Sequence, residues 1–190
     1  PAGDVQLALD ITRLADRSPQ YAALQVLAVQ CNVAARHLDD AVTIASRAMQ
    51  TFPASADSAR IAAAVFAASG RWAETLGAST EWRDRDPSQP LDPDVMIGRS
   101  YLKMGKPQDS LKQIQPYLAS AASNPETYAG VIELYGRIQL AQGHPGAAED
   151  RLWPFAKSSR AGLISFLQIA AEDAPPDVAK RWFAMAKTEL

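Results

Sequence analysis

A spacing of 34 residues between similar segments is the feature that most restricts how this chain can fold. Residues 36–41 (RHLDDA) are followed 34 residues later by residues 70–75 (GRWAET), and Pro53 is followed by Pro87 at the same distance. A fixed period of this length indicates stacked copies of one small unit rather than a single wound core. The 190 residues are enough for about five such units.

The unit is predicted to be a pair of helices. Leu7, Ile11 and Leu14 recur at helical spacing, and the abundant alanine favours helix and close helix–helix approach. Prolines and glycines divide the chain into segments of about 12–16 residues, which is typical of antiparallel helix pairs. No alternating run of β-branched residues is bounded by hairpin turns, so strands are not expected.

Small, aromatic, glycine and proline residues recur at matching places in five units that begin at residues 22, 56, 91, 129 and 160. In chain order they are Ala41, Ala48, Pro53, Ala63, Phe66, Gly70, Pro87, Gly98, Tyr101, Gly105, Gly136, Gly143, Ala148, Phe183 and Ala186. With these residues the chain resembles the tetratricopeptide repeat (TPR) family, although the repeats are degenerate. In the first unit, for example, Arg36 occupies the position where the family has a turn glycine.

The resemblance implies an all-α fold, a right-handed superhelical solenoid of antiparallel helix pairs. We expect one repeat domain over residues 1–190. Residues 4–17 would be the second helix of a truncated unit, followed by helix pairs at 22–55, 56–90, 91–128, 129–159 and 160–190. A helical array with a different period is the alternative fold.

Two prolines fall late in second helices, at Pro116-Tyr117 and Pro154-Phe155. An interior proline kinks or breaks a helix because it lacks the N–H donor and clashes with the preceding turn. We predict that both second helices bend or break there, with the following aromatic residue refilling the core. In the alternative interpretation, the prolines mark early helix ends.

No group of residues has the pattern of a catalytic or metal site. His37 and His144 fall beside the turns of their units, and Cys31 lies on an apolar stripe without a neighbouring base. Phosphate-loop, dinucleotide and zinc-ligand spacings are absent. The acidic pairs at 39–40, 149–150 and 172–173 are expected near helix ends, where they are solvated or oppose a helix dipole. We therefore expect a protein that is not an enzyme, with no cofactor and no metal.

The resemblance also implies a concave groove, lined by the first helices of successive units. The tentative peptide-groove residues are Gln30, Arg60, Arg99, Lys103, Arg137 and Gln168, flanked by Val26, Val33, Asp57, Ala64, Asp92, Val95, Glu133, Leu140, Ile164 and Glu172. Arg60, Arg99, Lys103 and Arg137 would form a basic stripe that suits an extended or helical peptide of some acidic character. In the alternative interpretation, Asp57, Asp92 and Glu133 neutralise the stripe. Val26 and Gln30 stand where a chaperone-tail clamp would need Lys and Asn, so no such clamp is expected.

The sequence thus predicts a non-catalytic scaffold that binds a protein or peptide in the groove. One alternative is a helical repeat domain of a larger enzyme or of a secretion or polysaccharide-export machine. Another is a homo-oligomer assembled through its end helices. The net charge of −2 and the pI of about 5.7 disfavour nucleic acid as a partner, and no apolar run is long enough for membrane insertion. The compartment, cytoplasmic or periplasmic, stays open.

Overall fold

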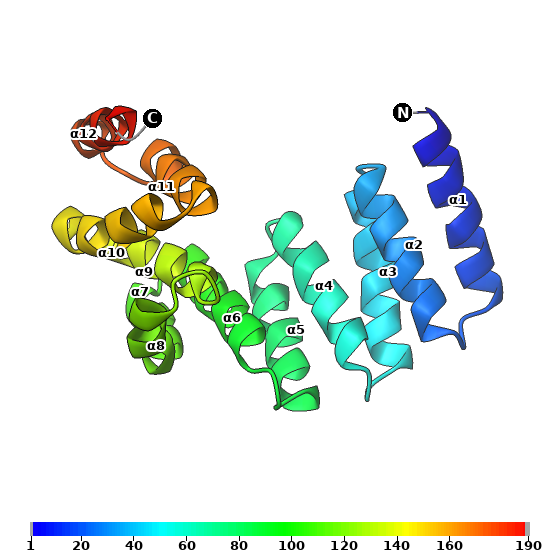
Figure 1. The fold of residues 1–190 in the computed structure, drawn as a ribbon. Coiled ribbons are helices and arrows are strands. Elements are labelled where there is room, and N and C mark those ends of the chain that lie inside the picture. Colours follow the sequence, from blue (N-terminus) through cyan, green and yellow to red (C-terminus); the bar gives the residue numbers. More distant parts are fainter. Residues whose placement is uncertain (1, 189–190) are drawn as a thin grey trace. The chain divides into compact units, whose positions relative to one another are not determined.

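The computed structural model describes the backbone of residues 2–188 and the side chains of residues 5–188 (Figure 1). Within this described part the chain is helical, without a strand, so the predicted all-α class is confirmed. The chain forms two compact units, Pro1–Ser100 and Tyr101–Leu190. The expectation of a single repeat domain stays a prediction.

The first unit is a row of helices, each packed on its neighbour in the chain. It contains α1 (Ala2–Arg17), α2 (Ala22–Ala34), α3 (Leu38–Thr51), α4 (Ala56–Ala68), α5 (Trp72–Arg85) and most of α6 (Leu91–Lys103). Short turns reverse the chain between successive helices (Figure 1). Beyond the packing of consecutive helices from α1 to α5, α2 also contacts α4. This contact places two first helices of successive predicted pairs side by side.

The second unit repeats this arrangement. It contains α7 (Pro107–Ile114), the short 3₁₀ helix η1 (Gln115–Tyr117), α8 (Leu118–Ser123), α9 (Ala129–Ala141), α10 (Pro145–Ser158), α11 (Arg160–Glu172) and α12 (Pro176–Lys187). Consecutive helices from α9 to α12 pack on one another, and α9 also contacts α11, as α2 contacts α4. Helices begin at 22, 56, 91, 129 and 160, the residues at which the sequence predicted unit starts.

Local capping explains several of these starts. The Ser55 hydroxyl accepts a hydrogen bond from the Ser58 N–H (3.2 Å), and the Ser159 hydroxyl accepts one from the Gly162 N–H (3.0 Å). Each bond satisfies one of the four N–H groups left free at a helix start. Prolines open α7, α10 and α12, where the missing N–H removes no intrahelical bond.

Four of the turns between paired helices have the same hydrogen-bonded geometry. Each contains one residue with φ between 63° and 78°, namely Arg36, Gly70, Gly105 and Gly143. The residue after it donates its N–H to the carbonyl five positions back. These bonds are His37 to Asn32, Arg71 to Phe66, Lys106 to Tyr101 and His144 to Gln139, at 2.8 to 2.9 Å. This is the Schellman helix end, and Arg36 adopts the left-handed conformation that glycine adopts in the other three.

The two interior prolines behave differently. At Pro116 the helix is interrupted, because α7 ends at Ile114 and η1 intervenes before α8 begins at Leu118. At Pro154 no break or early end occurs, and α10 runs on to Ser158. The predicted break is therefore confirmed at Pro116 only. Pro154 and Asp150, the residue whose carbonyl loses its intrahelical donor, are both exposed, so water can replace the missing hydrogen bond.

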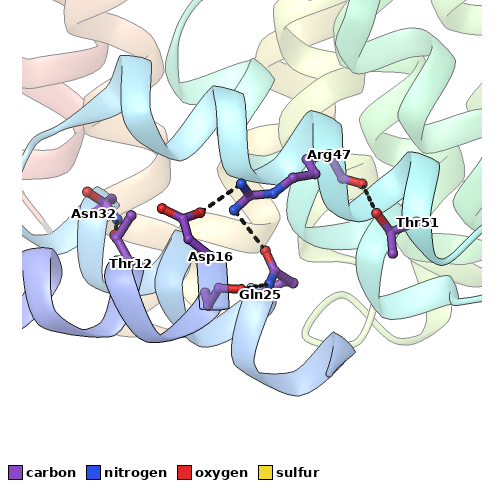
Figure 2. Close-up of polar contacts among 7 residues, drawn as sticks. Thr12, Asp16, Gln25, Asn32, Arg47 and Thr51 are labelled. Atoms are coloured by element: carbon purple, nitrogen blue, oxygen red, sulfur yellow. Dashed lines mark hydrogen bonds and ion pairs between the residues drawn. The ribbon is translucent and has the colours of Figure 1, made fainter. Parts of the chain in front are cut away.

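A polar network around the buried Gln25 ties α1 to the two helices that follow it (Figure 2). Gln25, 1% exposed, donates to the Ala15 carbonyl (2.8 Å) and accepts from the Arg47 guanidinium (3.2 Å). The same guanidinium forms an ion pair with Asp16 at 2.7 Å. Because Ala15 belongs to the last turn of α1, Gln25 satisfies a carbonyl at the end of that helix.

Candidate functional site

Three of the predicted groove residues meet in one small pocket of the first unit. The pocket lies between α2 and α4 and has a volume of about 250 Å³. Its lining residues are Gln30, Val33, Ala34, Ile61, Ala64, Val65 and Ala68. Gln30, Val33 and Ala64 were predicted to face a groove, whereas the other four were not identified. Their apolar character and their spacing along α2 and α4 were the available signal.

The pocket exists because small side chains line the contact between the two helices. Ala64 and Ala68 are exposed and lie one turn apart on α4, so they leave room beside the wall formed by Val33 and Ala34. Ile61 and Val65 are buried, at 9% and 1% exposure, and form the floor of the pocket. Gln30 supplies the polar side chain of this lining, and its amide makes no hydrogen bond to any described residue.

Arg60, the other predicted site residue of α4, does not line this pocket. Its guanidinium donates to the Asp57 carboxylate from both Nε (3.2 Å) and Nη2 (3.0 Å). Asp57 and Arg60 are separated by one helical turn and both are exposed, so the ion pair is solvated and weak. An incoming carboxylate would have to compete with Asp57 for this cation.

The predicted residues of α6 fall on either side of the boundary between the units. Arg99 belongs to the first unit, is half-buried and already interacts with another part of the chain. Lys103 belongs to the second unit, in the last turn of α6, and is exposed.

Arg137 and Gln168 lie on neighbouring first helices of the second unit, α9 and α11. Arg137 bonds to Glu172 at 3.0 Å and forms an ion pair with Asp173, both at the end of α11. Gln168 is exposed on the same helix. Arg137 is only 22% exposed and pairs with two carboxylates, so its charge is neutralised by side chains of the same unit.

Two cations of the expected basic stripe are paired with acidic side chains within their own units. Arg60 and Arg137 are each paired with acidic side chains, and of those expected to neutralise the stripe, Asp57 does so directly. Glu133 accepts a hydrogen bond from Ser165 (2.5 Å). Of the predicted groove residues, Gln30, Val33 and Ala64 line the apolar pocket between α2 and α4.

The residues considered for chemistry lie in turns or on a helix face. His37 and His144 precede α3 and α10, each within its turn, and Cys31 is half-buried on α2. Among the described residues, no three His, Cys, Asp or Glu side chains are grouped closely enough to hold a metal ion. In the same part of the chain, no helix combines the length and apolar character needed to cross a membrane. No protein-family model and no curated protein matches the chain.

Proposed function

We propose that this chain is a protein-interaction module of the TPR kind, a non-catalytic scaffold that binds a peptide or protein segment on its first helices. The observation that carries the proposal is the pocket between α2 and α4, which gathers Gln30, Val33 and Ala64 at positions that line the groove in that family. In this proposal the helix pairs stack as a right-handed superhelix. The recurring turns at 36, 70, 105 and 143 and the paired contacts α2–α4 and α9–α11 support such stacking.

The pocket suits one apolar side chain of a partner. Burying a Leu, Val or Phe side chain in such a site contributes about 1.5–3 kcal/mol. The free amide of Gln30 at the pocket edge can donate to and accept from the backbone of the bound segment. A peptide with an apolar anchor whose backbone is held by Gln30 is therefore the ligand that this unit fits best.

An acidic character of the partner is a secondary part of the proposal. Arg60 lies on α4, the helix that forms one wall of the pocket, but it is already paired with Asp57. A carboxylate on the ligand could replace Asp57, and exchanging one exposed ion pair for another gains at most a few tenths of a kcal/mol. Apolar burial is therefore expected to dominate the affinity.

The test is a selection from a displayed peptide library against the immobilised chain, followed by affinity measurements on the enriched peptides. Ala64→Arg fills the pocket from an exposed position and is expected to reduce the affinity tenfold or more, because about 1.5 kcal/mol of apolar burial is lost. Ala73→Arg places the same side chain on α5, outside this pocket, and should leave the affinity unchanged. Enriched peptides that bind both variants equally would contradict the proposal.

A further inference from the structure

The first unit contains a second and larger hollow, formed mainly by the second helices α3 and α5. Its volume is about 440 Å³, within the range of sites that bury a ligand group. The hollow is lined by Met49, Phe66 and Ala78, which are buried or half-buried, and by the exposed side chains of Gln50, Glu74 and Glu81. It shares no lining residue with the pocket between α2 and α4.

Gly77 keeps this hollow open. It lies in the middle of α5 and lines the hollow between Glu74 and Glu81. A Cβ atom added at Gly77 would meet no atom within 4 Å, and its φ is not in the left-handed region. Neither packing nor backbone conformation therefore requires glycine here, although glycine weakens a helix interior relative to alanine. What the missing side chain does provide is space in the hollow.

The charges at the hollow favour a basic ligand. Glu74 and Glu81 are 44% and 49% exposed, whereas the Arg85 guanidinium is 13% exposed and is held by the Ser55 carbonyl (2.9 Å) and by Glu81. Glu74 is paired with Arg71, which does not line the hollow. A backbone hydrogen bond at Glu74, followed by the hydrogen bond from Arg71, holds the pKa of the Glu74 carboxyl below its usual range. Arg71 contacts Oε1 of Glu74, and Arg85 contacts Oε2 of Glu81.

We propose that this hollow between α3 and α5 binds a second peptide segment, in which an apolar side chain lies between two basic residues. The apolar side chain would enter the space beside Gly77 and contact Met49 and Phe66. The basic residues would reach the exposed carboxylates of Glu74 and Glu81, two residues that lie about two helical turns, or about 10 Å, apart on α5. An extended segment rises about 3.3 Å per residue, so two basic residues three positions apart span that distance with the apolar anchor between them.

The experiment titrates the chain into short labelled peptides that carry one leucine between two lysines, and follows fluorescence anisotropy. Saturable binding is expected for the lysine peptide, and at least tenfold weaker binding for matched peptides with glutamate for lysine or glycine for leucine. Gly77→Leu fills the hollow and is expected to weaken binding of the lysine peptide about tenfold or more. No saturable binding of the lysine peptide, or equal binding of the glutamate peptide, would overturn the proposal.

A matched glycine provides the control. Gly146 lies in a helix of the second unit, and a Cβ added there also meets nothing within 4 Å. Gly146→Leu should therefore leave the affinity for the lysine peptide unchanged. Gly77→Leu enters open space on its helix, so its circular dichroism and thermal midpoint should match or exceed those of the parent chain. A folded Gly77→Leu variant that still binds with the parent affinity would refute the assignment.

Ala64→Arg separates this inference from the proposed function. It blocks the pocket between α2 and α4 and is expected to leave the lysine peptide bound at the hollow between α3 and α5. If Ala64→Arg abolishes binding of the lysine peptide while Gly77→Leu does not, the peptide occupies the α2–α4 pocket. In that case the inference fails and the proposed function stands.

Discussion

The cores of the two units are packed with different kinds of side chain. The core of the first unit is dominated by alanine, including Ala28, Ala41, Ala45, Ala48, Ala59, Ala62 and Ala63, all fully buried. In the second unit the largest fully buried side chains include Trp182, Phe166, Leu134, Ile138, Leu152 and Ile169. Helices can approach closely because both carry small residues, or because one carries glycine opposite a large residue. The same helix-pair plan therefore tolerates two kinds of core.

Two glycines of the second unit serve close packing. A Cβ on Gly136 would lie 2.5 Å from the Leu152 side chain, and one on Gly162 would lie 2.2 Å from the Phe155 carbonyl oxygen. The helical Gly77 of the first unit meets no such neighbour. Large residues thus impose sharp steric requirements at two helix contacts of the second unit, which contains a pocket of about 140 Å³. The alanine-rich first unit contains larger hollows, of about 440 and 250 Å³. The following substitutions test that contrast.

The largest effect is expected at Trp182. Its ring is fully buried, stacks on Phe166 at 4.8 Å between centroids, and donates a hydrogen bond to Glu149 (2.6 Å). Trp182→Ala should lower the free energy of unfolding by about 3–5 kcal/mol, measured by urea denaturation. The adjacent Phe183 is 43% exposed, and Phe183→Ala should cost much less. Equal losses for both variants would mean that α12 does not pack as described.

The next largest effect is expected at Gly162, because a side chain added there would overlap backbone atoms of Phe155, which cannot move easily. Gly162→Ala should destabilise the chain by about 1–3 kcal/mol, because the new methyl group overlaps the Phe155 carbonyl. Gly146→Ala, in open space, should be neutral or slightly stabilising in the same denaturation experiment. A neutral Gly162→Ala would remove the contrast between the two cores.

A polar residue provides the comparable test in the first unit. Gln25→Ala leaves the Arg47 guanidinium with one partner fewer and removes a donor from the Ala15 carbonyl. We expect a loss of about 1–3 kcal/mol in the free energy of unfolding. Gln30→Ala on the same helix removes an exposed amide that has no partner among the described residues, and its thermal midpoint should stay close to that of the parent chain. A Gln25→Ala midpoint equally close to the parent value would show that the network does not stabilise α1.

The smallest effect is expected at the turns, which the two units share. Arg36 has φ 63°, a conformation that glycine adopts without strain, so Arg36→Gly should stabilise the chain by about 0.5–1 kcal/mol. Gly70→Ala imposes the reverse change at φ 70° and should destabilise by a similar amount. Thermal melts of the two variants should shift in opposite directions. A destabilised Arg36→Gly would mean that the arginine side chain itself supports the turn.

Much of the local architecture could be predicted from the sequence, because turn chemistry is local. Gly70, Gly105 and Gly143 mark helix ends, and the spacing placed Arg36 in the same kind of turn although its side chain gave no such signal. The helix was predicted to bend or break at Pro154; it does not break there, where Pro154 is exposed, and exposure is set by tertiary packing rather than by the local sequence. The pairing of Arg137 with Glu172 and Asp173 could not be predicted, because it joins residues about 35 positions apart through tertiary packing.

The candidate site was predictable only in part for the same reason. Gln30, Val33 and Ala64 follow from the register of the repeat, whereas the hollow beside Gly77 depends on how α3, α4 and α5 pack together. Sequence periodicity identifies the face of a helix, but it does not reveal whether neighbouring side chains fill the space above that face.

The most direct test of the central claim is amide chemical-shift mapping with a library-selected peptide on the ¹⁵N-labelled chain. If the first helices bind a partner segment, the largest shifts will gather at Gln30, Val33, Ala64 and Ala68, and will disappear in Ala64→Arg. Shifts confined to other helices, or shifts that persist unchanged in Ala64→Arg, would contradict the account.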